Sequence, residues 1–549
     1  MTLKHLAVFT GLLAACFAAL PPPGQAARTF APVEHRSARG SLFEWSPLIE
    51  QVQHLLIEFD LFAGPAAGRI TPETQQAIRA YQTQSGLPVD GTANEALLRH
   101  METVGRAATL KRRLARARDE QVERARSALQ GSAATRDLLL SEKPVLAALP
   151  PEGAEACFRN PDVDCLLKGA TAAIRDIGRE DYRDWALRDV IRAQAAAGRM
   201  AAARASIKQL SDLRLVLVSL REAAASLAEA GYHAEAFRLT ETIPDPWNRA
   251  RALLAIAIAT PDAPQARDAL LTLLPHLEDR GGAIEIAAEL LANRGERGAT
   301  GDVDAAFRTI GSLLDDFDNP SRIALGAVAS AYARAGLSRE TSEMLGRIGD
   351  ASRDQIALVE FAGMLARQGK PSKATATAER LRTPQLYVLA VTKIATAEIG
   401  RGRSNIAAEF LERAETAVLD IDRVFAADTA LARIAAGWTD LAAPEKALAN
   451  IAKQKDPTLK AQTLWELAVK LDGSAVDAFS QAVMATDKIE SAFDRAATFA
   501  RAARELSDAR MPERARQVFE LAVRETKAIR SGWWRARILS LLATVLTKI

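Results

Sequence analysis

Apolar and polar residues alternate along most of the chain with the period of an amphipathic helix, and short turns interrupt the pattern at a regular interval. The interval from Gly198 to Gly231 recurs from Gly336 to Gly369 and from Gly369 to Gly402. Each glycine ends one alanine-rich helix and precedes another. A period of about 33–34 residues is typical of stacked helical hairpins, in which each unit buries its apolar face only against its neighbours.

The positions around these glycines are also alike from repeat to repeat. Eleven positions before each glycine stand Leu187, Leu220, Leu325, Leu358 and Val391. Seven positions before it stand Ile191, Ala224, Ala329, Ala362 and Ala395, mostly small residues that let two helices approach closely. The pattern resembles the tetratricopeptide repeat in a degenerate form, because the aromatic residue near the start of each repeat and the closing proline are mostly missing.

This resemblance implies an all-α protein in which residues 154–549 form a tetratricopeptide-like α-solenoid of about ten hairpins. We expect an elongated superhelix with a large concave surface and no single globular core. Trp533 and Trp534 either belong to the core of the last repeat or form an exposed docking patch.

The N-terminal segment, residues 1–27, predicts an export signal. Lys4 precedes an apolar run over residues 6–20, and residues 21–27 supply prolines and small residues for cleavage. The run is shorter than the roughly 20 residues that a membrane-spanning helix needs, and no later stretch is apolar enough to cross a bilayer. We therefore expect an exported, periplasmic protein. Leu13 to Cys16 also resembles a bacterial lipoprotein processing site, so a lipid anchor at Cys16 is the alternative.

Residues 28–45 have no periodicity and are expected to form a flexible spacer, and the most specific motif follows over residues 46–105. Thr71 and Pro72 are suited to the start of a helix, as N-cap and first helical residue. Gly86 can end that helix in the left-handed conformation, and Asp90 with Gly91 is a strong turn dipeptide. A third helix is expected from about residue 92 to 101.

The motif resembles the small three-helix peptidoglycan-binding domain, and the resemblance implies peptidoglycan as a ligand. Ala67 with Gly68 stands where the family often has Asp-Gly, and Thr71 replaces a usual glycine. The expected core residues are Leu55, Ile78, Leu87 and Leu97. The candidate contacts to glycan or stem peptide are Phe62, Tyr81 and Gln82, which could instead pack inside the domain.

Residues 106–153 are expected to link the two domains, as a charged helix over 106–131 followed by a proline-containing stretch. Acidic residues within that helix disfavour a membrane-surface role. Beyond the signal the cysteines are Cys157 and Cys165, which in one continuous helix would lie about 12 Å apart, too far for a disulfide. Asn160 and Pro161 predict a turn between them. Two cysteines across a turn in an exported protein favour a disulfide.

Composition and motifs narrow the function. The chain has 71 basic and 68 acidic residues, interspersed along helix faces, which disfavours nucleic acid as a partner. Its six histidines are isolated, and neither a nucleophile elbow nor a phosphate-binding loop is present. We therefore expect no catalytic site, metal or cofactor.

The resulting hypothesis is a non-enzymatic envelope adaptor. Its N-terminal domain would attach to peptidoglycan, and its solenoid would bind an unidentified envelope protein. The candidate partner groove carries Arg188, Arg192 and Arg221, whose guanidinium groups could pair with carboxylates or carbonyls. The alternative is a regulator or subunit of a wall-modifying enzyme, or a divergent wall hydrolase.

Overall fold

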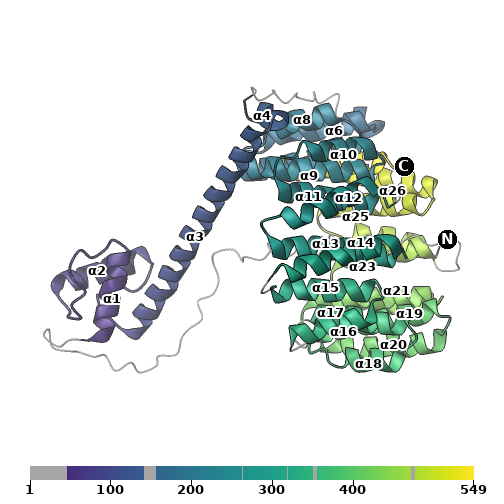
Figure 1. The fold of residues 1–549 in the computed structure, drawn as a ribbon. Helices are drawn as coiled ribbons and strands as arrows, with labels where there is room; N and C mark the ends of the chain where they lie inside the picture. The colour runs from purple at the N-terminus through teal and green to yellow at the C-terminus, as the bar shows by residue number, and fades with distance from the viewer. Residues whose placement is uncertain are drawn as a thin grey trace. The chain divides into compact units, whose positions relative to one another are not determined.

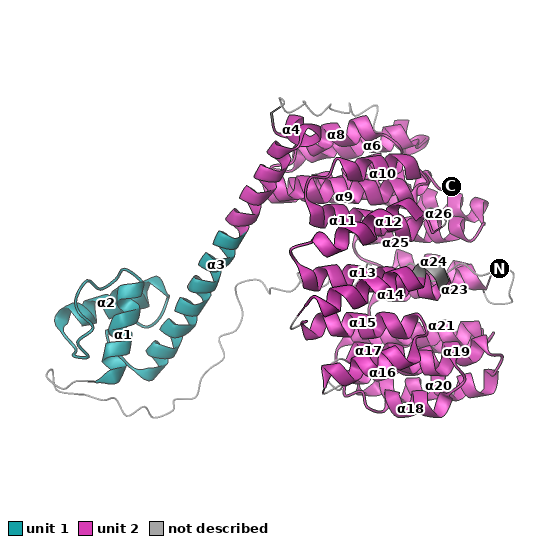
Figure 2. Cartoon of the chain, viewed as in Figure 1, with its two compact units in different colours: residues 1–117 teal, residues 118–549 magenta. Residues whose placement is uncertain are grey.

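The computed structural model describes residues 46–140, 156–261, 264–298, 300–317, 320–349, 355–471 and 477–549. The predicted export signal, the spacer and Cys16 lie outside these ranges. The described residues form helices and no strand, and they divide into two compact units, residues 1–117 and 118–549 (Figures 1 and 2). Each unit is described by itself.

Unit 1 contains α1 (Pro47–Glu58), α2 (Pro72–Gln84) and the first part of α3 (Glu95–Gly131). Its core consists of Val52, Leu56, Ala77, Ile78, Tyr81, Leu97 and Met101, with Leu55 and Leu87 packed partly buried against it. The start of α2 is as expected: Thr71 caps it by accepting a 3.2 Å hydrogen bond from the Thr74 amide, and Pro72 is its first residue. Gly86 after the helix has a positive φ of 67°.

The third helix is longer than expected. It continues from Glu95 to Gly131 instead of ending near residue 101, so the charged segment 106–131 is part of the same helix. Ala125 and Leu129 on it are buried in the core of unit 2. α4 (Ala133–Leu140) is held to the same unit by ion pairs from Asp137 to Arg204 and Lys208. Residues 118–140 of the expected linker are therefore a packed part of the repeat array.

Unit 2 is built from helical hairpins, in each of which we call the first helix the A helix and the second the B helix. The A helices are α7 (Glu180–Ala196), α9 (Leu213–Glu229), α11 (Pro246–Ala259), α13 (Arg280–Glu296), α15 (Arg322–Arg334), α17 (Gln355–Arg367), α19 (Pro384–Gly400), α21 (Val424–Asp440), α23 (Pro457–Lys470), α25 (Ala492–Asp508) and α27 (Gly532–Leu546). The B helices are α8 (Met200–Ile207), α10 (His233–Glu241), α12 (Pro264–Leu273), α14 (Thr300–Asp315), α16 (Ser338–Ile348), α18 (Pro371–Ala378), α20 (Ser404–Ala417), α22 (Pro444–Ala452), α24 (Ala478–Asp487) and α26 (Pro512–Thr526). Short 3₁₀ helices follow α6, α12 and α20: η1 (Ile174–Asp176), η2 (Leu274–His276) and η4 (Val418–Asp420).

The turn between the helices of a hairpin is the same in many repeats. All five glycines that mark the sequence period have φ between 70° and 90°. Ala442 and Arg510 occupy the same place with φ of 55° and 64°, although a side chain disfavours that conformation. These two substitutions explain why the period fades in the C-terminal third of the sequence.

The array closes on itself, which corrects the expectation of an elongated superhelix. α27 is the last of the described helices, and it packs against α6 (Val163–Ala173), which precedes the first A helix. α27 also packs side by side with α7, as every other A helix packs with the next. α6 therefore takes the place of a B helix for α27. These two helices form a hairpin whose members come from opposite ends of the array, and it joins those ends.

The closed array has one continuous core rather than separate interfaces. A single cluster of buried residues extends from Ala125 to Val545. In Figure 1 the helices descend from α9 to α17 on one side and return from α19 to α25 on the other. A helices pack along their length against neighbouring A helices, whereas B helices touch one another little, so the A helices form the inner layer of a ring.

Candidate functional site

Two buried glutamines hold the loops of unit 1. Gln82 on α2 accepts hydrogen bonds from the amides of Asp90 (3.1 Å) and Gly91 (2.9 Å), and its Nε2 donates to Asp90 Oδ1 (2.7 Å). Gln53 on α1 accepts from the Gly68 amide (2.9 Å) in the same way. Each glutamine therefore fixes a turn whose glycine has a positive φ, 71° at Gly91 and 66° at Gly68.

The first loop keeps this arrangement without the aspartate that is usual there. Ala67 has no carboxylate that could accept a hydrogen bond from Gln53. The Nε2 of Gln53 donates instead to the Arg69 carbonyl (2.9 Å) and to Thr74 Oγ1 (3.0 Å). The departure from the family pattern is thus compensated inside the domain. Gln53 was not among the residues expected from the sequence, and its separation from Gly68, 15 residues, differs from the 9 residues between Gln82 and Gly91.

The three candidate ligand contacts in unit 1 have different surroundings. Tyr81 is only 3% exposed, its ring stacks on Phe59 with centroids 5.4 Å apart, and its hydroxyl lies 2.9 Å from His100 Nδ1. Burial raises the pKa of the Tyr81 hydroxyl. Tyr81 and Gln82 therefore have structural roles, with their polar atoms bonded within the domain. Phe62 is half-buried, lies over Gly64 and packs against the edge of the unit 1 core.

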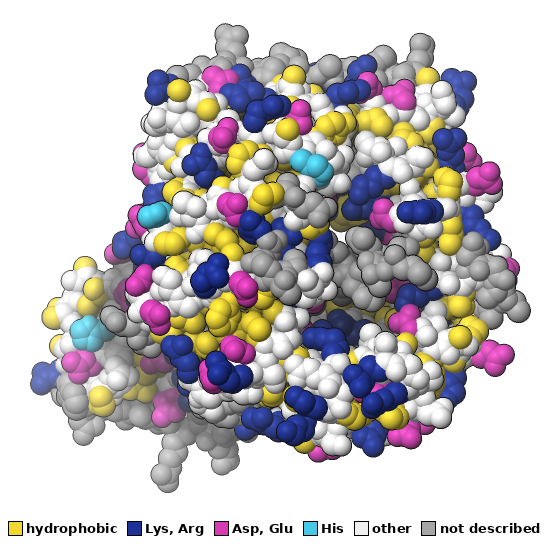
Figure 3. All heavy atoms as spheres, turned by 45° about the vertical axis from the view of Figure 1, so that its right-hand side comes forward, with side chains coloured by type: hydrophobic (Ala, Val, Ile, Leu, Met, Phe, Trp, Pro, Cys, Tyr) yellow, Lys and Arg dark blue, Asp and Glu magenta, His cyan; other side chains and the backbone are white. Residues whose placement is uncertain are grey.

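The inner layer of unit 2 is the second candidate surface. An A helix meets neighbouring A helices on two sides and B helices on the outside, so its exposed side chains face the interior of the ring. Lys and Arg are interspersed with Asp and Glu over the surface in Figure 3, with basic side chains inside the hollow near the middle of that face. The interior wall is therefore charged, with both signs present.

Ion pairs link A helices to their neighbours along this wall. They are Arg188–Glu222, Arg251–Glu289, Arg334–Glu296, Lys393–Glu360 and Lys470–Asp440, with Arg537–Asp189 between α27 and α7. Most join residues 30 to 38 positions apart, about one repeat, and the last pair makes the same connection across the closure. The wall thus carries a belt of ion pairs, each of which joins two adjacent A helices.

The candidate groove arginines lie at the start of this belt. Arg188 donates to Glu222, and Arg221 lies 3.7 Å from the same carboxylate and 3.4 Å from Asn248 Oδ1. Burial lowers the pKa of the Arg221 guanidinium. Arg192 on α7 is exposed. Two of the three arginines therefore share one carboxylate, which leaves Arg192 as the most available of them to a ligand.

Two glutamates on neighbouring A helices have perturbed acidity. Burial, together with the nearby Glu466 carboxylate, raises the pKa of Glu505 to about 7, although Arg501 and Arg504 oppose the shift. Burial also raises the pKa of Glu466. Both residues are nevertheless exposed to solvent, on α23 and α25, so the shift reflects the protein atoms crowded around the carboxyls and not a covered side chain.

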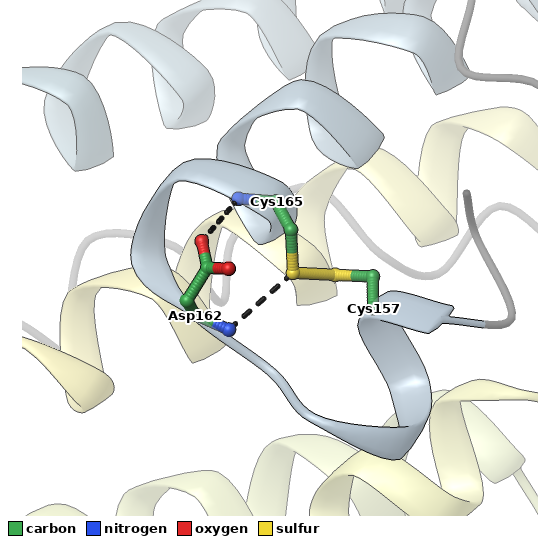
Figure 4. The surroundings of a disulfide bond; sticks show 3 residues. All are labelled: Cys157, Asp162 and Cys165. Atoms are coloured by element: carbon green, nitrogen blue, oxygen red, sulfur yellow. Dashed lines mark hydrogen bonds between the residues drawn. A yellow bond between two sulfur atoms is a disulfide. The ribbon is translucent and has the colours of Figure 1, made fainter.

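Cys157 and Cys165 are bonded to each other, with Cα atoms 5.7 Å apart (Figure 4). Asp162 caps α6 between them: its side chain accepts a 2.7 Å hydrogen bond from the Cys165 amide, and its own amide donates to Cys165 Sγ at 3.4 Å. The disulfide therefore sits at the start of α6, the helix that pairs with α27. In the described ranges, we find neither a group of three metal-ligating side chains nor a helix able to span a membrane.

Comparison with known proteins identifies unit 1. Residues 46–101 match the family model of the putative peptidoglycan binding domain. The match confirms the resemblance, supports peptidoglycan binding by this unit and associates the protein with the cell envelope. The remainder is a helical repeat array, as expected.

Other comparisons add no functional information. No curated protein matches the chain. Among solved structures, the crystal structure of Ton1535 from Thermococcus onnurineus NA1 aligns with 59% of this chain and 99% of its own length, at 14% identity and a TM-score of 0.23. That score is too low to carry an argument.

Proposed function

We propose that this protein is a non-enzymatic adaptor of the periplasm or cell envelope, attached to peptidoglycan through unit 1 and bound to a protein partner through the ring of unit 2. The family match over residues 46–101 is the observation that carries the proposal. Unit 2 supports it because a rigid ring of helical repeats exposes a long wall of side chains to a ligand.

The charged residues of that wall favour binding over chemistry. Most carboxylates along it are paired with an arginine or lysine of the next A helix, which suits a structural belt. A divergent wall hydrolase is the second candidate, and the specific observation for it is Glu505, whose pKa of about 7 would suit a general acid. A regulator of a wall-modifying enzyme would use the same two surfaces as the adaptor.

One experiment separates these functions. The purified protein is incubated with isolated sacculi, the pellet is assayed for the protein, and the supernatant is assayed for released muropeptides. The adaptor should pellet without releasing muropeptides, and a variant lacking residues 46–117 should stay in solution. Muropeptide release that is lost in Glu505→Gln would assign the hydrolase, whereas pelleting of the variant without unit 1 would overturn the attachment through that unit.

A further inference from the structure

A row of exposed apolar side chains crosses the interior wall of unit 2. Ile323 on α15, Ile356 on α17 and Leu389 on α19 occupy the same position in successive repeats, and we call them the apolar row. Ile323 is 73% exposed and Ile356 is 50% exposed, while Leu389 is half-buried. On the next A helix, α21, Phe425 is 61% exposed. These helices therefore leave unburied an apolar surface that none of the described residues covers.

In the described part of the chain, two arginines on the same helices have no carboxylate of their own to pair with. Arg367 on α17 donates to the Ala333 carbonyl at 3.1 Å, and within the described residues Arg433 on α21 makes neither a hydrogen bond nor an ion pair. Burial lowers the pKa of both guanidinium groups, and nearby glutamates such as Glu360 only partly oppose the shift. Glu360 is already paired with Lys393, whose Nζ donates a 2.9 Å hydrogen bond to Glu360 Oε2. An added carboxylate would thus stabilise this part of the wall.

The spacing of the row limits the shape of its occupant. Packed helices lie about 8–10 Å apart, so successive members of the row are separated by roughly that distance. In an α-helix, residues i and i+7 lie on one face with a rise of about 10.5 Å. A helix that crosses α15, α17 and α19 can therefore place one apolar side chain against each.

We propose that the interior wall from α15 to α21 binds an acidic amphipathic helix of a partner protein. Its apolar face packs on the apolar row and Phe425, and its flanking carboxylates pair with Arg367 and Arg433. This inference rests on the proposed function, since it specifies the class of partner that the ring recruits. It moves the main docking surface from α7 and α9, where Arg188 and Arg221 already share Glu222, to the opposite arc of the ring.

The test uses two labelled synthetic peptides with leucine at heptad spacing, each long enough for about five helical turns. One peptide has glutamate at the positions flanking the leucines and alanine elsewhere, the other has lysine in place of each glutamate, and each is titrated against the whole protein by fluorescence anisotropy. We expect the glutamate peptide to bind at least 10-fold more tightly than the lysine peptide. Ile323→Ser with Ile356→Ser should weaken its binding at least 10-fold, and Arg433→Ala several-fold with a reduced dependence on salt.

Matched controls lie away from the wall. Leu419→Ser replaces an apolar side chain that is 79% exposed on η4, and Arg516→Ala replaces an exposed arginine on the B helix α26. Neither should change binding. Equal binding of both peptides, no binding of either, or an unchanged affinity of the isoleucine variant would overturn the inference. A dimer that dissociates in the isoleucine variant would assign the row to a second copy of the chain and would also overturn it.

Attachment to the wall is measured in the same preparations. If the glutamate peptide fails to bind while the protein still pellets with sacculi, this inference fails and the peptidoglycan attachment stands. If pelleting fails while the peptide binds, the attachment through unit 1 fails and the docking surface stands.

Discussion

Arg537 and Asp189 are 348 residues apart in the chain, yet Arg537 Nε donates a 2.8 Å hydrogen bond to Asp189 Oδ2. Beside this pair, Trp533 of α27 stacks on Tyr182 with ring centroids 5.1 Å apart. In an open solenoid the terminal repeats each expose an apolar face. Here α27 covers the faces of α6 and α7, so each end of the array is the neighbour of the other.

Trp533→Ala should lower the free energy of unfolding of unit 2 by about 2–3 kcal/mol, because it removes a large, partly buried ring from the closure. Arg537→Ala should cost under about 1 kcal/mol, because its ion pair with Asp189 is partly exposed and screened by water. Urea unfolding followed by circular dichroism measures both. Trp185→Ala is the control, since that side chain is 57% exposed on α7. A Trp533 variant as stable as the Trp185 variant would mean that the closure contributes little.

The helices of the array were predictable, but their closure was not. The ends of five A helices are marked locally, by a glycine of positive φ and by small residues at fixed distances from it. The closure depends on the summed rotation of all the repeats, which the periodicity does not specify, and on contacts between residues such as Tyr182 and Trp533 that are far apart in sequence. Trp533 and Trp534 were expected either in the core of the last repeat or in an exposed docking patch, and they pack partly buried against the core, at the join.

The Cys157–Cys165 bond should be present in the exported protein and should stabilise unit 2 by roughly 2–3 kcal/mol, since it closes a short loop in the unfolded chain. Thiol labelling of freshly isolated, denatured, unreduced protein should find neither residue free. The variant with both cysteines changed to serine should unfold at a lower urea concentration. Free thiols in the isolated protein would contradict this prediction, and unchanged stability of the double variant would contradict the energetic part.

Gln82→Ala and Gln53→Ala should each destabilise unit 1 by about 2–3 kcal/mol, because each leaves buried backbone amides without an acceptor. The measurement is thermal unfolding of residues 46–117, which have their own core. Gln84→Ala is the matched control, since Gln84 is exposed at the end of α2. Equal melting temperatures for all three variants would show that the loops do not depend on the glutamines.

Phe62→Ala should weaken binding of residues 46–117 to sacculi several-fold while leaving most of the domain folded, because this residue is only half-buried at the edge of the core. Co-sedimentation at several salt concentrations measures the binding, and circular dichroism checks the fold. Tyr81→Phe is the companion variant: it removes the hydroxyl contact to His100 but keeps the buried ring, so binding should persist. Weaker binding by Tyr81→Phe than by Phe62→Ala would reverse these assignments.

The surroundings of the candidate contact residues in unit 1 were harder to predict than its fold. The caps and turns at Thr71, Gly86 and Gly91 depend on local residue types, and the structure has them as expected. Whether Gln82 binds a ligand or a loop depends on where Asp90 lies in space. A glutamine is usually exposed, so the burial of Gln53 and Gln82 beside glycine turns carries no clear sequence signal.

The free energy of unfolding of unit 2 should fall as pH rises from about 5 to 8, in part because of Glu505. Its pKa is raised from the ordinary 4.5 to about 7 in the folded protein, so between these values the folded state holds a proton that the unfolded state has lost. The folded state then binds more protons, and the stability gained from the neutral side chain is present at low pH and is lost as pH rises through 7.

Glu505→Gln stays neutral at every pH. It should match the parent protein near pH 5 and be more stable at pH 8, in urea unfolding at both pH values. Glu520→Gln, on the exposed side of α26, is the control and should follow the parent throughout. If Glu505→Gln loses as much stability as the parent between pH 5 and 8, the carboxyl of Glu505 titrates near its ordinary value and the interior of the ring does not desolvate it.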